Sequence, residues 1–251
     1  MQAFKEIYNL PDKIVVTAHR GFSGKYPENT LVAFEEAVKI GADIIEFDVR
    51  GSKDDIPVIL HDETLDRTTN GFGLPENMNL AELKKLNASF WEGCHDSGIR
   101  LNKAKVKNLR IPSLEESFEL LKDKAYMNVQ VYTDSFKVIQ NIIELYDKFN
   151  LYEKAFFMLP SFKQAKVFRG INSRVAICVG EERENLQKHK VFGVDFIQPY
   201  KTLINTEFCK KIQDMNLCAN MFYSNTNEEN EKYIKCGIKG IMTDRPDILI
   251  Q

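Results

Sequence analysis

The sequence predicts an α/β protein of the TIM-type (β/α)8 barrel class, with a small insertion after the strand ending at His61. The length of 251 residues suits one such barrel. Short β-rich runs alternate with helical patterns, which is typical of parallel strands joined by crossover helices. One stretch, between His61 and Pro112, is too long for an ordinary loop. We therefore expect a single domain over residues 1–251, with an inserted subdomain at about residues 63–110.

Nine β-rich runs compete for the eight strand positions of the barrel. They cover residues 14–18, 43–49, 57–60, 126–131, 155–159, 174–179, 195–198, 218–223 and 240–243. The second and third runs are too close for a helix between them, so we expect these two strands to be joined directly. At least one of the nine runs is therefore misassigned or lies outside the barrel.

Helix signals fall between most of these runs. Thr30 can cap a helix whose apolar stripe begins at Leu31, and Gly41 can end it. A serine followed three residues later by a glutamate forms a capping box for a helix at residues 113–121. Apolar residues recur with helical spacing over residues 135–149.

Composition and charge exclude several classes of function. The formal net charge is -2, so no electrostatic argument favours nucleic acid or an anionic membrane as a partner. Five cysteines, an odd number without a C-x-x-C pair, indicate reduced thiols. The apolar run Ile14–Val16 is too short for a signal-peptide core or a membrane span. We expect a cytoplasmic protein, or a periplasmic one if a leader has been removed, without stable membrane association; its oligomeric state is left open.

Two of the four histidines stand at the ends of β-rich runs. His19 follows the first run and precedes Arg20, and His61 follows the third run and precedes Asp62. An imidazole titrates near neutral pH, so a pair of them can supply a base and an acid together. We therefore predict that His19 and His61 are the catalytic acid and base.

Two carboxylates lie between these histidines in the sequence. Glu46 and Asp48 are two residues apart in a strand, so their side chains point to the same face. Two like charges inside a barrel are costly unless a positive group neutralises them. Mg²⁺ or Ca²⁺, which prefer oxygen ligands, would do so. Salt bridges to Arg20, Arg50 or Arg67 are an equally good explanation from the spacing alone.

Taken together, these motifs resemble the glycerophosphodiester phosphodiesterase family. The resemblance is specific over residues 17–71, through His19-Arg20-Gly21, Pro27-Glu28-Asn29-Thr30, Gly41-Ala42-Asp43, Glu46-x-Asp48, His61-Asp62 and Leu65-x-Arg67-Thr68-Thr69-Asn70-Gly71. It resumes with Ile111-Pro112-Ser113-Leu114-Glu115-Glu116, Ser161-Phe162, Asn225-Thr226 and Thr243-Asp244-Arg245-Pro246. It therefore spans nearly the whole chain.

The resemblance implies a function as well as a fold. It implies a TIM barrel that hydrolyses small-molecule glycerophosphodiesters to glycerol 3-phosphate and an alcohol. The catalytic residues would be His19 and His61, and the cofactor would be a divalent metal ion, Mg²⁺ or Ca²⁺. The implied metal ligands are Glu46, Asp48 and Gln130, and the implied substrate-binding residues are Arg20, Glu28, Asn29, Tyr132 and Phe222.

Three positions depart from the family's pattern. Members usually carry Glu-x-Lys after the strand at residues 126–131, but this chain has Gln130 and Tyr132 there. A glutamine carbonyl can still coordinate Mg²⁺ or Ca²⁺, without a formal charge. A tyrosine hydroxyl can hydrogen-bond a phosphate, again without a charge. The family's usual tryptophan aligns with Phe222.

Two other functions remain open from the sequence. One is a protein of the same fold that binds a phosphodiester or phosphate without turnover. Gln130 and Tyr132 favour this alternative, whereas the presence of both His19 and His61 argues against it. The other is a phospholipase of a neighbouring barrel family, such as sphingomyelinase D. The Pro-Glu-Asn-Thr and Leu-x-Arg-Thr-Thr motifs argue against the phospholipase.

Overall fold

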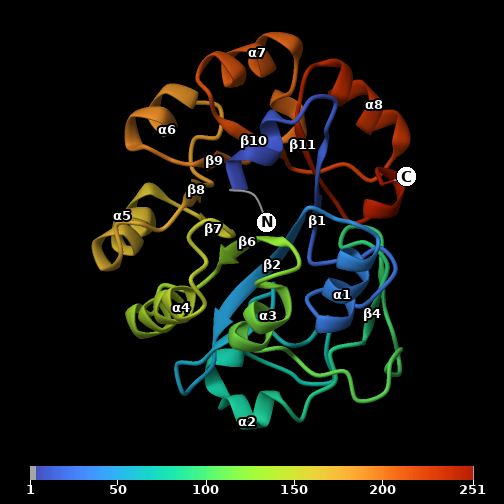
Figure 1. Ribbon diagram of the computed structural model, residues 1–251. Coiled ribbons are helices and arrows are strands. Elements are labelled where there is room, and N and C mark those ends of the chain that lie inside the picture. The colour runs from blue at the N-terminus through green and yellow to red at the C-terminus, as the bar shows by residue number, and fades with distance from the viewer. Residues whose placement is uncertain (1–3, 251) are drawn as a thin grey trace.

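The computed structural model describes residues 4–250, and in it helices surround a nearly closed barrel of parallel strands (Figure 1). Hydrogen-bonded neighbours run in the order β8-β7-β6-β2-β1-β11-β10-β9. The Asp195 N–H donates to the Ile177 carbonyl oxygen at 2.9 Å, across the remaining gap between β8 and β9. These eight strands confirm the predicted TIM-type barrel. Their bounds are β1 (Val15–Ala18), β2 (Ile44–Gly51), β6 (Tyr126–Val131), β7 (Ala155–Leu159), β8 (Ile177–Val179), β9 (Phe196–Ile197), β10 (Cys218–Met221) and β11 (Gly240–Thr243).

The third β-rich run is the one that lies outside the barrel. It forms β3 (Pro57–Ile59), which pairs antiparallel with the end of β2, Ile59 opposite Val49. The direct connection of the second and third runs is thus confirmed. The long segment that follows β3 therefore starts from a hairpin partner of β2 and not from a barrel strand. The hairpin turns the chain back to the barrel rim, where the Leu60 N–H donates to the Asp48 carbonyl oxygen at 3.0 Å.

Seven helices between the strands form the outer layer, and the caps that the sequence predicts are present. The Thr30 hydroxyl accepts the Ala33 N–H at 3.3 Å, and Ser113 begins a capping box with Glu116. Capping satisfies amides that would otherwise lack partners at the helix start. The helices are α1 (Leu31–Lys39), α3 (Leu114–Leu121), α4 (Phe136–Lys148), α5 (Phe162–Ile171), α6 (Leu186–Phe192), α7 (Thr206–Asp214) and α8 (Asn227–Lys235).

The segment between β3 and α3 holds only short elements. They are η2 (Pro75–Asn77), α2 (Leu80–Leu83), β4 (Trp91–Glu92) and β5 (Ile99–Arg100). Its apolar side chains form a small cluster apart from the main core, made of Val58, Leu60, Leu65, Leu83, Ala88 and Ile111. The predicted division of the chain into a barrel and a subdomain at about residues 63–110 stays a prediction.

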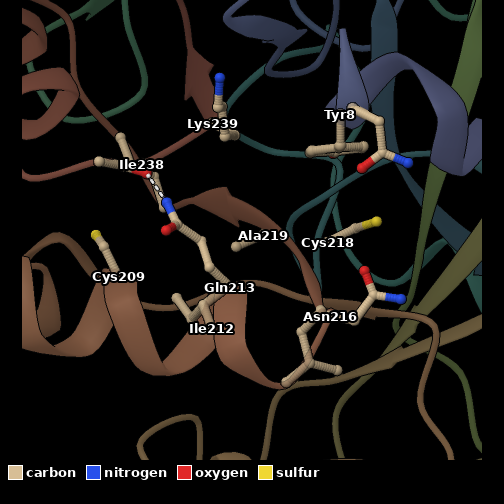
Figure 2. A pocket seen from close by; sticks show the side chains of 12 residues that line it. Tyr8, Cys209, Ile212, Gln213, Asn216, Cys218, Ala219, Ile238 and Lys239 are labelled. Carbon is tan, nitrogen blue, oxygen red and sulfur yellow. Dashed lines mark hydrogen bonds between the residues drawn. The ribbon is translucent and has the colours of Figure 1, made fainter. Parts of the chain in front are cut away.

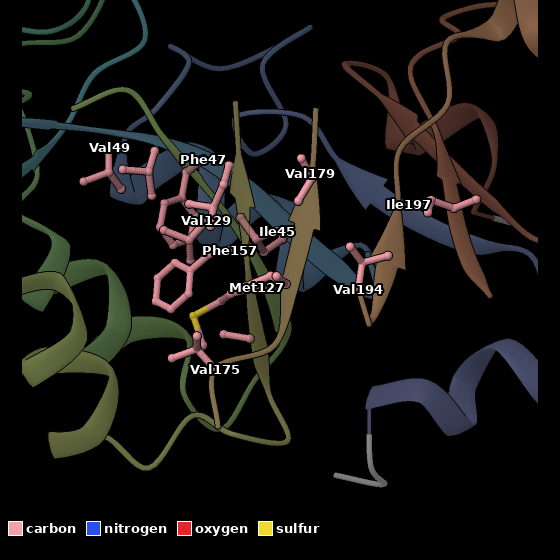
Figure 3. Packing of buried hydrophobic residues seen from close by; sticks show 14 of the residues in the cluster. Ile45, Phe47, Val49, Met127, Val129, Phe157, Val175, Val179, Val194 and Ile197 are labelled. Carbon is pink, nitrogen blue, oxygen red and sulfur yellow. The ribbon is translucent and has the colours of Figure 1, made fainter. Parts of the chain in front are cut away.

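The apolar core has two parts because side chains alternate across each barrel strand. One set faces outward and packs under the helices, for example Phe47, Val129 and Phe157 (Figure 3). Burying a side chain of this size contributes about 1.5–3 kcal/mol. The other set lies inside the lower barrel, where the 3-10 helix η1 (Phe4–Asn9) closes the end. Phe4 stacks on Tyr126 with ring centroids 4.7 Å apart.

The upper half of the barrel interior is polar. Along each strand every second side chain points inward. These inward side chains are apolar in the lower barrel and polar near the carboxyl ends of the strands, where His19, Asp48 and Gln130 lie. Two further 3-10 segments, η3 (Lys201–Leu203) and η4 (Pro246–Ile248), follow β9 and β11. Within residues 4–250, no helix has the length and apolar character needed to cross a bilayer.

Candidate active site

The predicted site residues come together at the carboxyl ends of the barrel strands. His19 directly follows β1, Glu46 and Asp48 lie on β2, and Gln130 lies on β6. The parallel register places Asn128 beside Glu46 and Gln130 beside Asp48. This is the end of the barrel where TIM-barrel enzymes keep their active sites.

His19 is a buried imidazole held by a carboxylate. Its Nδ1 lies 2.7 Å from Asp244 Oδ1, and only 3% of the residue is exposed. Burial alone would raise the pKa of Asp244, but His19, Asn225 and Ser23 lower it well below its usual range. Asp244 therefore stays ionised and fixes the tautomer that keeps Nε2 free. That nitrogen lies 4.0 Å from Glu46 Oε2.

His61 repeats this arrangement nearer to solvent. Its Nδ1 lies 2.7 Å from Asp62 Oδ1, and its side chain is 25% exposed. Arg67 donates from Nε to Asp62 Oδ2 at 2.7 Å and from a terminal nitrogen to Oδ1 at 2.9 Å. Burial opposes ionisation of Asp62, but His61 and Arg67 outweigh it and lower its pKa. Both predicted catalytic histidines thus have one ring nitrogen held and the other available.

Ion pairs connect the surroundings of His61 with those of Asp48. Both Glu28 oxygens accept from Arg67 at 2.7 Å, and Oε1 also accepts from Arg20 at 2.7 Å. Burial would raise the pKa of Glu28, but the two guanidinium groups lower it to about 2. Arg20 Nε also lies 3.2 Å from Asp48 Oδ2. Both guanidinium groups are thus held in place by carboxylates.

Glu46 and Asp48 present unsatisfied oxygens to the site. The Arg20 N–H donates to Glu46 Oε2 at 2.9 Å, and Asn29 Nδ2 donates to Asp48 Oδ2 at 2.7 Å. Glu46 Oε1 and Asp48 Oδ1 are buried, and neither has a hydrogen-bond partner among residues 4–250. Burial and the neighbouring Asp48 carboxylate raise the pKa of Glu46 well above its usual value. Two buried carboxylate oxygens without donors fit a divalent cation.

Two of the three positions that depart from the family's pattern, Gln130 and Tyr132, contact each other. Gln130 Nε2 donates to the Tyr132 hydroxyl, which leaves the Gln130 carbonyl oxygen as the ligand-type atom. The Tyr132 ring lies edge-on to His61 at 5.2 Å, and the Arg50 guanidinium lies 5.4 Å from the same ring. Burial and the Asp48 and Glu46 carboxylates raise the pKa of Tyr132, so its hydroxyl stays protonated.

The remaining predicted residues line the site in different ways. Phe222 lies edge-on to His19 with centroids 5.5 Å apart, and Tyr223 stacks on the same imidazole at 5.5 Å. Asn29 is committed to Asp48 through its amide, and its Oδ1 accepts the Asp48 N–H at 3.2 Å. Glu28 is likewise committed to two arginines. Their substrate-binding roles stay predictions.

Sequence reasoning gave no role to the residues that hold the histidines. Asp244 and Asn225 belong to quoted motifs, and Asp62 directly follows His61, yet none was predicted as a site residue. Asp244 could have been found, because it directly follows β11 at the end of the barrel where His19 lies. His95, whose ring lies 5.1 Å from that of His61, carries no such signal, because it stands in the insertion outside every motif.

A cavity lies at the other end of the barrel. It has a volume of about 240 Å³ and lies between the starts of β10 and β11, with Tyr8, Cys218 and Lys239 among its lining residues (Figure 2). None of the predicted site residues lines it. The chemistry described above is therefore separate from this cavity.

Comparison with known sequences points to one family. The sequence model described as "Glycerophosphoryl diester phosphodiesterase family" matches residues 19–248. A glycerophosphodiester phosphodiesterase of Caldanaerobacter subterraneus subsp. tengcongensis is 31% identical, over 95% of this chain and 97% of that protein. A Bacillus subtilis protein of the same name is 29% identical, over 95% of this chain and 86% of that protein.

Solved structures share the fold. A putative glycerophosphoryl diester phosphodiesterase from Silicibacter pomeroyi superposes with a TM-score of 0.84 at 18% identity, covering 98% of this chain and 95% of that one. An Oleispira antarctica phosphodiesterase in complex with the product sn-glycerol-3-phosphate has a TM-score of 0.77 at 23% identity, covering 93% and 94%. Because the family model and the Caldanaerobacter relative each match nearly the whole chain, this chain belongs to the glycerophosphoryl diester phosphodiesterase family.

Proposed function

We propose that this protein hydrolyses glycerophosphodiesters to glycerol 3-phosphate and an alcohol, with His19 and His61 as the acid and base. The observation that carries the proposal is that each imidazole is held at Nδ1 by an aspartate, at 2.7 Å, with the other nitrogen left available. A group that must take or give a proton needs this fixed tautomer and position. Positioned acids and bases contribute about 10²–10⁴-fold to a rate.

We further propose that Glu46, Asp48 and Gln130 hold a divalent cation, Mg²⁺ or Ca²⁺. The support is the pair of buried carboxylate oxygens without donors, beside the Gln130 amide in the register of β2 and β6. When bound, such an ion supplies positive charge to a phosphoryl oxygen. The chain's own residues hold the carboxylates in place, through Arg20 and Asn29.

Substrate binding is proposed for residues around these groups. Arg20 is a buried cation next to Asp48 and suits a phosphate, and Tyr132 can donate its hydroxyl to one. The Phe222 ring beside His19 can pack on the glycerol carbons. Glu28 and Asn29 are proposed to belong to the same substrate-binding set, and their contacts hold Arg20 and Asp48 in place.

The segment at about residues 63–110 is proposed as an inserted subdomain. Leu65, Leu83 and Ala88 of this segment lie in an apolar cluster apart from the main core, completed by Val58, Leu60 and Ile111 at its two ends, and this supports the division. Arg67, within the segment, fixes Asp62 and reaches Glu28. The insertion would thus both cover the rim of the barrel and position His61.

The experiment is hydrolysis of a panel of glycerophosphodiesters by the purified protein. Each substrate is tested with a chelator and after adding back Mg²⁺, Ca²⁺ or Mn²⁺. Release of glycerol 3-phosphate that stops with chelator and returns with one metal supports the proposal. Binding of a substrate without turnover under every condition would instead identify a phosphodiester-binding protein of the same fold.

A further inference from the structure

A group of side chains that could bind a metal includes His61 and lies outside the Glu46–Asp48 site. Ligand atoms of His61, Asp62 and His95 all lie within 4.8 Å of one another. The His61 and His95 rings meet edge-on with centroids 5.1 Å apart. His95 comes from the loop between β4 and β5, so the insertion brings a second imidazole to His61.

Both imidazoles are oriented as metal-bound histidines are. His61 Nδ1 lies 2.7 Å from Asp62 Oδ1, and His95 Nδ1 lies 2.9 Å from Asp96 Oδ1. A carboxylate on one ring nitrogen fixes the tautomer and leaves the other nitrogen unprotonated as a ligand. In both rings that nitrogen is Nε2. Asp62 is already committed to Arg67 through both oxygens, so the site offers two nitrogens rather than a carboxylate.

We propose that His61 and His95 form a second metal site, which takes up Zn²⁺ or a similar transition-metal dication and inhibits the enzyme when filled. Imidazole nitrogen suits Zn²⁺, Cu²⁺ and Ni²⁺, whereas Mg²⁺ and Ca²⁺ prefer oxygen. The two metal sites therefore differ in the ions that they select. Inhibition follows because the Nε2 lone pair of His61, once bound to the metal, is no longer available for proton transfer.

Access and geometry support the site. The His95 side chain is 34% exposed and that of His61 is 25% exposed, so an ion can arrive from solvent. Zn–N bonds are about 2.0–2.1 Å long, so two nitrogens bound to one ion lie no more than about 4.2 Å apart. The ligand atoms of this group lie within 4.8 Å of one another, which is close to that limit. Water would complete the coordination. Cys94 is a poor ligand, because burial and Asp244 raise the pKa of its thiol to about 11 and keep it protonated.

The binding part of this inference is independent of the proposed function, whereas the inhibition part rests on the proposed role of His61. Binding is therefore measured first, without substrate. Zn²⁺ is titrated into the full chain, and the histidine ring nitrogens are followed by NMR. The chain has only four histidines, so single substitutions assign every ring signal. We expect Zn²⁺ to shift the Nε2 signals of His61 and His95.

Three variants define the site by calorimetry with Zn²⁺. His95→Ala should weaken binding at least about tenfold, since loss of even an outer-shell partner costs 10–100-fold. Asp48→Asn, which disables the carboxylate site, and Cys94→Ser, next to His95, should leave this binding event in place. The inference is overturned if Zn²⁺ shifts neither His61 nor His95, or if His95→Ala binds it as tightly as the unchanged protein.

Activity then tests the inhibition. With Mg²⁺ or Ca²⁺ saturating, the Zn²⁺ concentration for half-inhibition should rise at least about tenfold in His95→Ala, each variant being compared with its own uninhibited rate. An unchanged value would overturn the inhibitory role. If no glycerophosphodiester is hydrolysed, the proposed function fails while the NMR and calorimetric results still decide whether the site exists.

Discussion

Gln130 lies directly beside Asp48 in the parallel register of β2 and β6. The neighbouring pair in the same register is Glu46 and Asn128, so each carboxylate of β2 faces an amide of β6. A carboxylate at position 130 would therefore stand beside Asp48, whose buried Oδ1 has no hydrogen-bond donor among residues 4–250. This relationship makes residue 130 a direct test of the proposed metal site.

We predict that Gln130→Glu lowers the divalent-ion concentration for half-maximal activity at least about tenfold, which is about 1.4 kcal/mol. A full negative charge in a partly desolvated site binds a dication more strongly than a neutral amide. Activity is titrated against Mg²⁺ and Ca²⁺ for both proteins. Gln140→Glu on α4 is the matched control, because it adds the same charge away from the strand ends. Unchanged metal dependence in Gln130→Glu would mean that Gln130 is not a ligand.

His19→Ala and His61→Ala should each lower turnover about 10²–10⁴-fold. The double variant should lose far less than the product of the two effects, because both groups act in one proton-transfer unit. Single-turnover rates on the best substrate of the panel provide the measurement. Near-normal rates in either single variant would refute the acid/base assignment.

Asp244→Asn should lower kcat about 10²–10⁴-fold at neutral pH with little change in KM. An amide can donate to His19 Nδ1, so Nε2 would carry the proton and could not accept one. An amide also does not stabilise a charged imidazolium as a carboxylate does, so His19 would be impaired as a base and as an acid. Asp247→Asn is the control, since Asp247 pairs with Arg245 at the surface. Full pH–rate profiles separate this effect from misfolding, because a misfolded variant loses activity without a change in the shape of its profile.

Much of the barrel is predictable because strand and helix signals are local. The bounds of β6, β7 and β11 agree with the β-rich runs, and Thr30 caps its helix as the sequence indicates. The antiparallel direction of β3 can be predicted from the length of its connection to β2, because so short a connection permits only an antiparallel hairpin. The amino-acid composition of the run does not indicate its direction.

The contacts that hold the site together are long-range and are not visible in local patterns. His19 and Asp244 are 225 residues apart in the chain and meet only because β1 and β11 are neighbours in the closed barrel. His95 reaches His61 through a loop of the insertion whose path no periodicity determines. The motifs therefore predicted residues that the fold brings together at one end of the barrel, but not the residues that orient the two histidines.

Glu28 is expected to make the stability of the protein depend on pH. The pKa of Glu28 falls from about 4.5 to about 2 in the folded protein, because Arg20 and Arg67 outweigh the effect of burial. The unfolded chain therefore binds a proton at this residue at higher pH than the folded protein does. The stabilisation is complete above about pH 4.5 and is lost as the pH falls toward 2. At about 1.4 kcal/mol for each pKa unit, its full size is about 3 kcal/mol.

Glu28→Gln should thus lower the free energy of unfolding at pH 7 by an amount that shrinks steadily between pH 5 and pH 3. Urea unfolding of both proteins across this range, with equal m-values, gives the difference at each pH. Glu228→Gln, on the exposed start of α8, is the control and should show almost no such trend. A difference for Glu28→Gln that stays constant from pH 7 to pH 3 would mean that the two arginines do not hold this carboxylate ionised. In that case the buried link between Arg20 and Arg67 would not be the electrostatic element that stabilises the site.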